Sequence, residues 1–146
     1  VALAADLAIA ADDAKFTLAY ARIGTSPDGS GTWHLPRLVG LRKALEIALL
    51  ADTIDAHEAL RLHLVNQVVP AAELEAATTA LAQRLAAGPT QAYGRIKRLL
   101  RQSADRDLPA QLDAERAAFH QSMKTEDFRE GIAAFLGKRP PTYQGR

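Results

Sequence analysis

Apolar residues recur with the period of an α-helix in the middle of the chain, and this repeat constrains the fold more than any other feature. Over residues 41–51 they fall at positions i, i+3, i+4, i+7 and i+8, the pattern of an amphipathic helix. Further helices are expected over 71–87, 90–103 and 109–136. Short apolar runs at 7–11, 15–20 and 65–69 predict strands. The chain is therefore expected to be an α/β protein, with its short strands in the N-terminal part of the sequence and mostly helices in the rest.

A capping box is expected at the start of a further helix. Asp55 precedes the run AHEALR, and Glu58 follows three residues later. In such a pair each side chain accepts a hydrogen bond from the backbone N–H of the other residue. This predicts a helix that begins directly after Asp55.

Composition excludes several classes of function. The 146 residues have the size of one domain, and 18 Lys and Arg against 17 Asp and Glu lack the basic excess of a nucleic-acid binder. The absence of cysteine excludes disulfides, thiol nucleophiles and Cys-ligated metals, and the four histidines lack metal-site spacing. No apolar stretch approaches the roughly 20 residues of a membrane helix, and the opening residues do not resemble a signal peptide. We expect a soluble, cytoplasmic protein without a bound metal.

The loop GTSPDGSG, residues 24–31, is the leading candidate for a functional site. It holds a carboxylate, Asp28, between a proline and glycines, and catalytic groups are often carried on loops that rigid elements position. Such a carboxylate can move a proton at a carbon beside a carbonyl. The alternative is that Asp28 is only a turn or N-cap residue. The loop lacks the lysine of a phosphate-binding P-loop, and no G-x-S-x-G motif of a hydrolase occurs.

The order of motifs resembles the enoyl-CoA hydratase/isomerase (crotonase) superfamily over the whole of residues 1–146. Its segments are ADLAIAADDAKF, GTSPDGSGTWHLPRLVG, ALEIALLAD, AHEALRLHLVNQVVP and the tail EGIAAFLGKRPPTYQGR. The resemblance implies the C-terminal portion of a crotonase-like ββα spiral in residues 1–70. It implies an α-helical oligomerisation region in residues 71–146, which assembles trimers or hexamers.

The resemblance also implies an activity. Members bind acyl-coenzyme A thioesters and stabilise the thioester enolate with two backbone amides, which would both lie ahead of Val1. Coenzyme A is then part of the substrate and no other cofactor is expected, nor a nucleic-acid or membrane partner. The chain looks like the C-terminal half of a longer protein, so little activity is expected from it alone. The alternative is an inactive fragment that serves as a structural or oligomerisation module.

The resemblance assigns the site residues one at a time. In the hydratase motif F-x-x-P-E-x-x-x-G, which corresponds to residues 16–24, Tyr20 stands at the glutamate. This departure puts a two-glutamate water addition in doubt. Asp28 coincides with the acidic residue of dienoyl-CoA isomerases, epoxyphenylacetyl-CoA isomerases and chlorobenzoyl-CoA dehalogenases, and SPDGSGTWHLPRLVG is nearest to the second group. Asp28 is therefore the expected catalytic residue.

Two further sets of residues follow from the same resemblance. The expected substrate pocket consists of Tyr20, Pro27, Gly29 and Trp33, although aromatic residues at such positions are as often part of a core. The expected coenzyme A contacts are Lys97, Phe135 and Lys138, although a basic residue near a chain end is most often only solvated.

Overall fold

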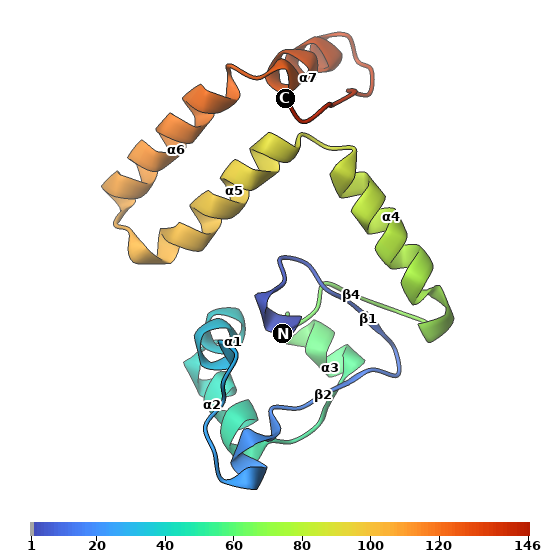
Figure 1. Ribbon diagram of the computed structural model, residues 1–146, viewed down its shortest axis with the longest axis vertical. Coiled ribbons are helices and arrows are strands. Elements are labelled where there is room, and N and C mark those ends of the chain that lie inside the picture. The colour runs from blue at the N-terminus through green and yellow to red at the C-terminus, as the bar shows by residue number, and fades with distance from the viewer. Residues whose placement is uncertain (1) are drawn as a thin grey trace. The chain divides into compact units, whose positions relative to one another are not determined.

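The computed structural model describes residues 2–146 (Figure 1). These residues divide into two compact units, a first that ends at Thr79 and a second that spans Ala80–Arg146. The expectation of one compact domain is therefore wrong. The division falls inside helix α4 (Leu74–Ala86), which begins in the first unit and ends in the second.

Two small sheets form in the first unit. Strand β1 (Ile9–Ala11) pairs in parallel with β4 (Gln67–Val69), and β2 (Lys15–Phe16) pairs antiparallel with β3 (Ile54–Asp55). The predicted strands at 7–11 and 65–69 are confirmed in part. The predicted strand at 15–20 is too long, because its second half enters a 3₁₀-helix, η2 (Ala19–Ile23).

Three α-helices lie wholly within the described part of the first unit: α1 (Gly31–Val39), α2 (Leu41–Leu50) and α3 (Ala56–Arg61). Two short 3₁₀-helices, η1 (Ala2–Ala4) and η3 (Ala71–Glu73), lie near its ends. The period-3.6 pattern correctly predicts α2.

Helix α1 is not predicted from the sequence, because Pro36 lies inside it. Proline lacks the N–H that would bond to the carbonyl four residues earlier, so it normally ends a helix. Here the helix is only nine residues long and stops at Gly40, whose N–H donates to the Pro36 carbonyl at 3.0 Å. The helix therefore loses a single internal hydrogen bond.

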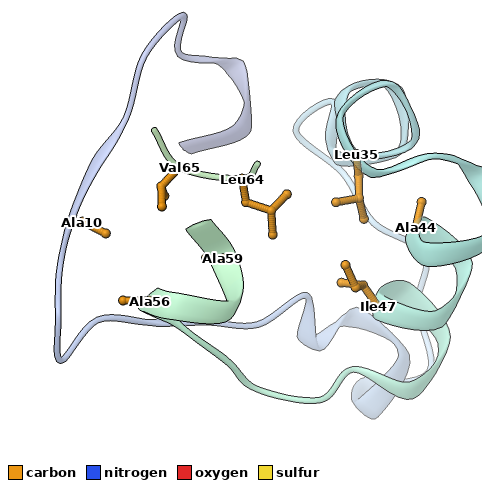
Figure 2. Close-up of a cluster of buried hydrophobic side chains, with 8 residues drawn as sticks. All are labelled: Ala10, Leu35, Ala44, Ile47, Ala56, Ala59, Leu64 and Val65. Atoms are coloured by element: carbon orange, nitrogen blue, oxygen red, sulfur yellow. The ribbon is translucent and has the colours of Figure 1, made fainter. Parts of the chain in front are cut away.

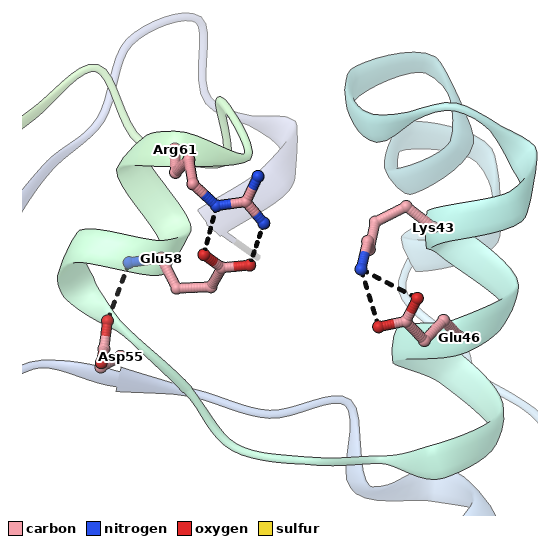
Figure 3. Close-up of polar contacts among 5 residues, drawn as sticks. All are labelled: Lys43, Glu46, Asp55, Glu58 and Arg61. Atoms are coloured by element: carbon pink, nitrogen blue, oxygen red, sulfur yellow. Dashed lines mark hydrogen bonds and ion pairs between the residues drawn. The ribbon is translucent and has the colours of Figure 1, made fainter.

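The predicted cap at Asp55 is confirmed, but the capping box is only half formed (Figure 3). The Asp55 carboxylate accepts from the Glu58 N–H at 2.8 Å. The Glu58 carboxylate does not return to Asp55; it pairs with Arg61, whose Nε lies 2.6 Å from Oε2. The hydrogen bond to Arg61 lowers the pKa of Glu58. Arg61, three residues further along the helix, therefore binds the Glu58 carboxylate that a complete capping box would use.

A core of small and branched side chains lies between α1, α2, α3 and the β1–β4 sheet (Figure 2). Ala56 and Ala59 on α3 are fully buried, and their size lets the helix approach the strands closely. Leu35 on α1 is 3% exposed and faces Ala44 and Ile47 on α2. The core therefore fixes α1 and α2 relative to the strands.

The second unit is helical. It contains the end of α4, then α5 (Thr90–Gln102), η4 (Ser103–Asp105), α6 (Leu108–Ser122) and α7 (Glu126–Leu136). Helices α5 and α6 pack against each other (Figure 1).

The predicted single helix over 109–136 is wrong, because the chain divides there into α6 and α7. The Thr125 hydroxyl accepts from the Phe128 N–H at 3.1 Å and caps α7. A threonine followed by two acidic residues is a start signal for a helix.

The residues after α7 fold back onto it. The buried carboxylate of Asp127 accepts the N–H groups of Gln144 and Gly145 at 2.7 and 2.9 Å. Arg139 pairs with Glu130 at 2.6 Å, and this hydrogen bond lowers the Glu130 pKa to about 2. The tail is thus held by two carboxylates of one helix.

Candidate active site

Tyr20 and Asp28 form the centre of the candidate site. The Tyr20 hydroxyl, carried by η2, donates a hydrogen bond of 2.5 Å to Oδ1 of Asp28 in the loop before α1. This hydrogen bond is the main cause that raises the pKa of Tyr20, followed by burial and the charge of Asp28. Tyr20 therefore stays protonated and donates to the carboxylate, while the second oxygen, Oδ2, takes no part in this bond.

Backbone turns bring the two side chains together. Gly24, in the left-handed region with φ of 71°, ends η2, and the Thr25 N–H donates to the Tyr20 carbonyl at 3.2 Å. Beyond Asp28, Gly29 is also left-handed at φ of 57°, where a side chain would strain the backbone. The Gly31 N–H then donates to the Asp28 carbonyl at 3.2 Å. The loop therefore reverses between η2 and α1, with Asp28 opposite Tyr20.

Sequence reasoning missed two residues that hold η2 in place. Thr17 Oγ1 and Arg22 Nη2 donate to the same acceptor, the carbonyl oxygen of Ala51, at 3.1 and 2.5 Å. Ala51 ends α2 and is far from both donors in the sequence, so no spacing rule connects them. The only signal is that a threonine and an arginine flank Tyr20.

Trp33 is half-exposed on α1, and its own helix covers it in part. The Arg37 guanidinium carbon lies 3.9 Å from the centre of the indole ring, within cation–π range. The His34 ring lies nearly perpendicular to the indole, with the ring planes at 80° and the ring centres 4.7 Å apart. That Trp33 lines the substrate pocket stays a prediction.

The first unit contains a cavity of about 290 Å³. Leu18, two residues before Tyr20, and Leu35, two after Trp33, form part of its wall. The other lining residues are largely apolar: Ala2, Leu3, Lys15, Phe16, Thr17, Ile47, Ile54 and Leu64. None of the five predicted site residues is among these walls, and Asp28 is exposed in this chain. The structure thus brings Asp28 and Tyr20 together without placing them in this cavity.

The predicted coenzyme A contacts all lie in the second unit, whereas Tyr20 and Asp28 lie in the first. Lys97 is on α5. Phe135 is 81% exposed near the end of α7, and the Lys138 N–H donates to its carbonyl at 3.2 Å. The structure therefore joins Phe135 and Lys138 in one turn and places Lys97 on another helix.

Residues 2–146 hold neither a metal site nor a membrane span of the kinds that side-chain clusters and helices would form. No group of three or more His, Asp or Glu side chains there could hold a metal ion. Within the same residues, no helix is both long and apolar enough to cross a membrane.

Comparison with known proteins assigns the family. The profile of the family described as enoyl-CoA hydratase/isomerase matches residues 1–146. A probable enoyl-CoA hydratase of Rhodobacter capsulatus is 44% identical over the whole chain, and the 1,2-epoxyphenylacetyl-CoA isomerase of Escherichia coli is 38% identical. The chain spans 57% and 56% of their lengths, and which part this is stays a prediction.

A solved structure agrees with this assignment. The crystal structure of an enoyl-CoA hydratase from Polaromonas sp. JS666 is 37% identical and superposes with a TM-score of 0.92. The match covers 97% of this chain and 55% of that one. These findings confirm the resemblance and the crotonase-like α/β fold, and the chain belongs to the enoyl-CoA hydratase/isomerase family.

Proposed function

We propose that this chain supplies the acid–base carboxylate, Asp28, of an enzyme that moves a double bond in an acyl-CoA thioester. The observation that carries the proposal is the hydrogen bond from Tyr20, at the position of a hydratase glutamate, to Asp28. A hydrogen bond to one carboxylate oxygen restricts the orientation of the carboxylate. The other oxygen then stays available to take a proton from the substrate. Family membership supports the thioester substrate.

The proposed reaction is a proton shuttle. The Asp28 carboxylate takes a proton from the α-carbon of a 3-enoyl thioester, and the electron pair of that C–H bond delocalises into the thioester carbonyl as a dienolate. The carboxylic acid then returns the proton to the γ-carbon, so that the double bond ends between the α- and β-carbons. Acid–base catalysis of this kind contributes ~10²–10⁴-fold in rate.

Tyr20 directs this chemistry toward isomerisation. Adding water across a double bond needs a group that accepts a proton from the water. The pKa of Tyr20 is raised, so its hydroxyl is protonated at neutral pH and is a poor base. Its hydroxyl donates to Oδ1 of Asp28, so Oδ2 is the oxygen that would take the carbon-bound proton.

Product analysis tests this proposal. The full-length product of the gene is incubated with 2-enoyl-CoA and with 3-enoyl-CoA. The products are separated by chromatography, and their molecular masses are measured by mass spectrometry. We expect interconversion of the two thioesters at unchanged mass. A 3-hydroxyacyl product, which gains the mass of one water, as the main product would contradict the isomerase assignment.

The coenzyme A contacts belong to the same proposal. Lys97 and Lys138 would bind the phosphates of coenzyme A through their ammonium groups. The exposed ring of Phe135 would pack on the adenine of coenzyme A.

A second candidate function is self-association through the second unit, either beside catalysis or in place of it. Large apolar side chains of this unit are more than half exposed: Ile96, Leu100, Leu108, Leu112, Phe119, Phe135 and Leu136. Apolar surface of this extent marks an interaction site. We propose that a second and third copy of the chain cover it.

Sedimentation of the full-length product tests this candidate. We expect the mass of a trimer or hexamer, and a shift toward the monomer when Leu100, 69% exposed on α5, is changed to Glu. Gln121→Glu adds the same charge at an exposed polar position and serves as the control. A monomeric wild-type protein would contradict the candidate.

A further inference from the structure

We propose that Arg22 is a positioning residue for the Asp28 carboxylate. Its hydrogen bond to Ala51 holds η2, the turn that carries Tyr20, against the end of α2, and Tyr20 in turn orients Asp28. The inference rests on the proposed function, in which Asp28 transfers the proton. It concerns a residue whose hydrogen bond goes to the Ala51 carbonyl and not to Asp28.

The anchor of this turn is a single carbonyl. Ala51 follows α2 in the left-handed region, with φ of 55°, and is 1% exposed. Arg22 Nη2 and Thr17 Oγ1 both donate to its oxygen in a partly buried contact. A carbonyl oxygen offers two lone pairs, so this pair of donors satisfies it fully.

The guanidinium is the stronger of the two donors. The last carbonyls of an α-helix carry partial negative charge, and a cation there is favourable. A hydrogen bond from a charged donor is also stronger than one from a hydroxyl. Arg22 therefore contributes more than Thr17 to fixing η2 on α2.

Tyr20 lies between the two donors along the chain. Thr17 comes just before η2 and Arg22 lies within it, so Tyr20 is held from both sides. The Tyr20 hydroxyl donates a hydrogen bond to Asp28, which lies in the loop before α1. The position of Tyr20 therefore determines where the Asp28 carboxylate is held. Without the Arg22 anchor, η2 can shift relative to α1, and a displacement of about 1 Å at a reacting group can cost ~10²-fold in rate.

Three variants of the full-length protein test the inference. Arg22→Met keeps the length of the side chain but removes the donors, and Arg22→Lys restores a charged donor. Arg42→Met removes an exposed arginine of α2 as the control. We expect Arg22→Met to lower kcat by roughly 10–100-fold with little change in KM, Arg22→Lys to recover most of the loss, and Arg42→Met to match the wild type.

The titration of Tyr20 gives a readout that does not depend on activity. Tyrosine labelled at Cζ is followed by NMR against pH, and the Tyr20 signal is assigned from its absence in Tyr20→Phe. We expect the raised pKa of Tyr20 to fall toward its ordinary value in Arg22→Met and to stay raised in Arg22→Lys and Arg42→Met. Thr17→Val should move both readouts in the same direction by a smaller amount, and it replaces Arg22→Met if that variant does not fold.

Two results would overturn the inference: a Tyr20 pKa that is unchanged in Arg22→Met and Thr17→Val, or a kcat loss that Arg22→Lys does not recover. Failure of the proposed function is distinguishable from either. It would show as unchanged turnover in Asp28→Asn, while the Tyr20 titration still decides whether Arg22 fixes the pair.

Discussion

Asp28→Asn should lower kcat of the full-length protein by ~10²–10⁴-fold, the usual contribution of a positioned acid or base. Asparagine has nearly the same shape as aspartate, and its side-chain oxygen can still accept the hydrogen bond from Tyr20. The amide cannot take a proton from carbon. The loss should therefore fall on kcat, while the affinity for the CoA thioester stays close to that of the wild type.

The measurement is steady-state isomerisation of a 3-enoyl thioester, with thioester affinity determined separately by calorimetry. Asp13→Asn, at an exposed acid in the turn between β1 and β2, is the matched control and should leave both quantities unchanged. Turnover by Asp28→Asn at the wild-type rate would assign the base to another residue.

Leu35→Ala should destabilise the protein by about 2–5 kcal/mol, the range for removing a buried leucine side chain. Leu35 is 3% exposed, and it packs in the cluster that joins α1 to α2. It also lines the cavity of about 290 Å³, so the truncation enlarges a space that is already present. Because α1 begins directly after the Asp28 loop, the loss of this contact also loosens the site.

Urea denaturation followed by circular dichroism measures this effect. Leu35→Met keeps the side-chain volume and should cost less than about 1.5 kcal/mol. Equal midpoints for Leu35→Ala and the wild type would show that the core does not depend on this contact.

Local sequence patterns predict most of the helices. They fail where the local structure depends on a contact with a distant residue or on a competing hydrogen-bond partner. Residues 41–51 carry enough apolar repeats to identify α2, and Asp55 identifies the start of α3. The reciprocal half of the capping box fails because Arg61 competes for Glu58. Helix α1 is missed because Pro36 indicates a break, although the core contact of Leu35 offsets the lost hydrogen bond.

The site is predicted as a set of residues but not as a geometry. Turn chemistry and the family resemblance single out Asp28 and Tyr20. Their hydrogen bond depends on the left-handed backbone at Gly24, and composition alone does not fix how a turn is oriented. The contact of Arg22 with Ala51 joins residues 29 positions apart, so it follows from tertiary packing and not from spacing.

Transfer of an isotope label tests the role of Asp28 most directly. A 3-enoyl thioester that carries deuterium on its α-carbon is converted by the full-length protein in ordinary water, and the product is examined by NMR. A single carboxylate that takes and returns the proton should deliver part of the label to the γ-carbon, and Asp28→Asn should abolish this transfer. Label that still reaches the γ-carbon in Asp28→Asn would contradict the account.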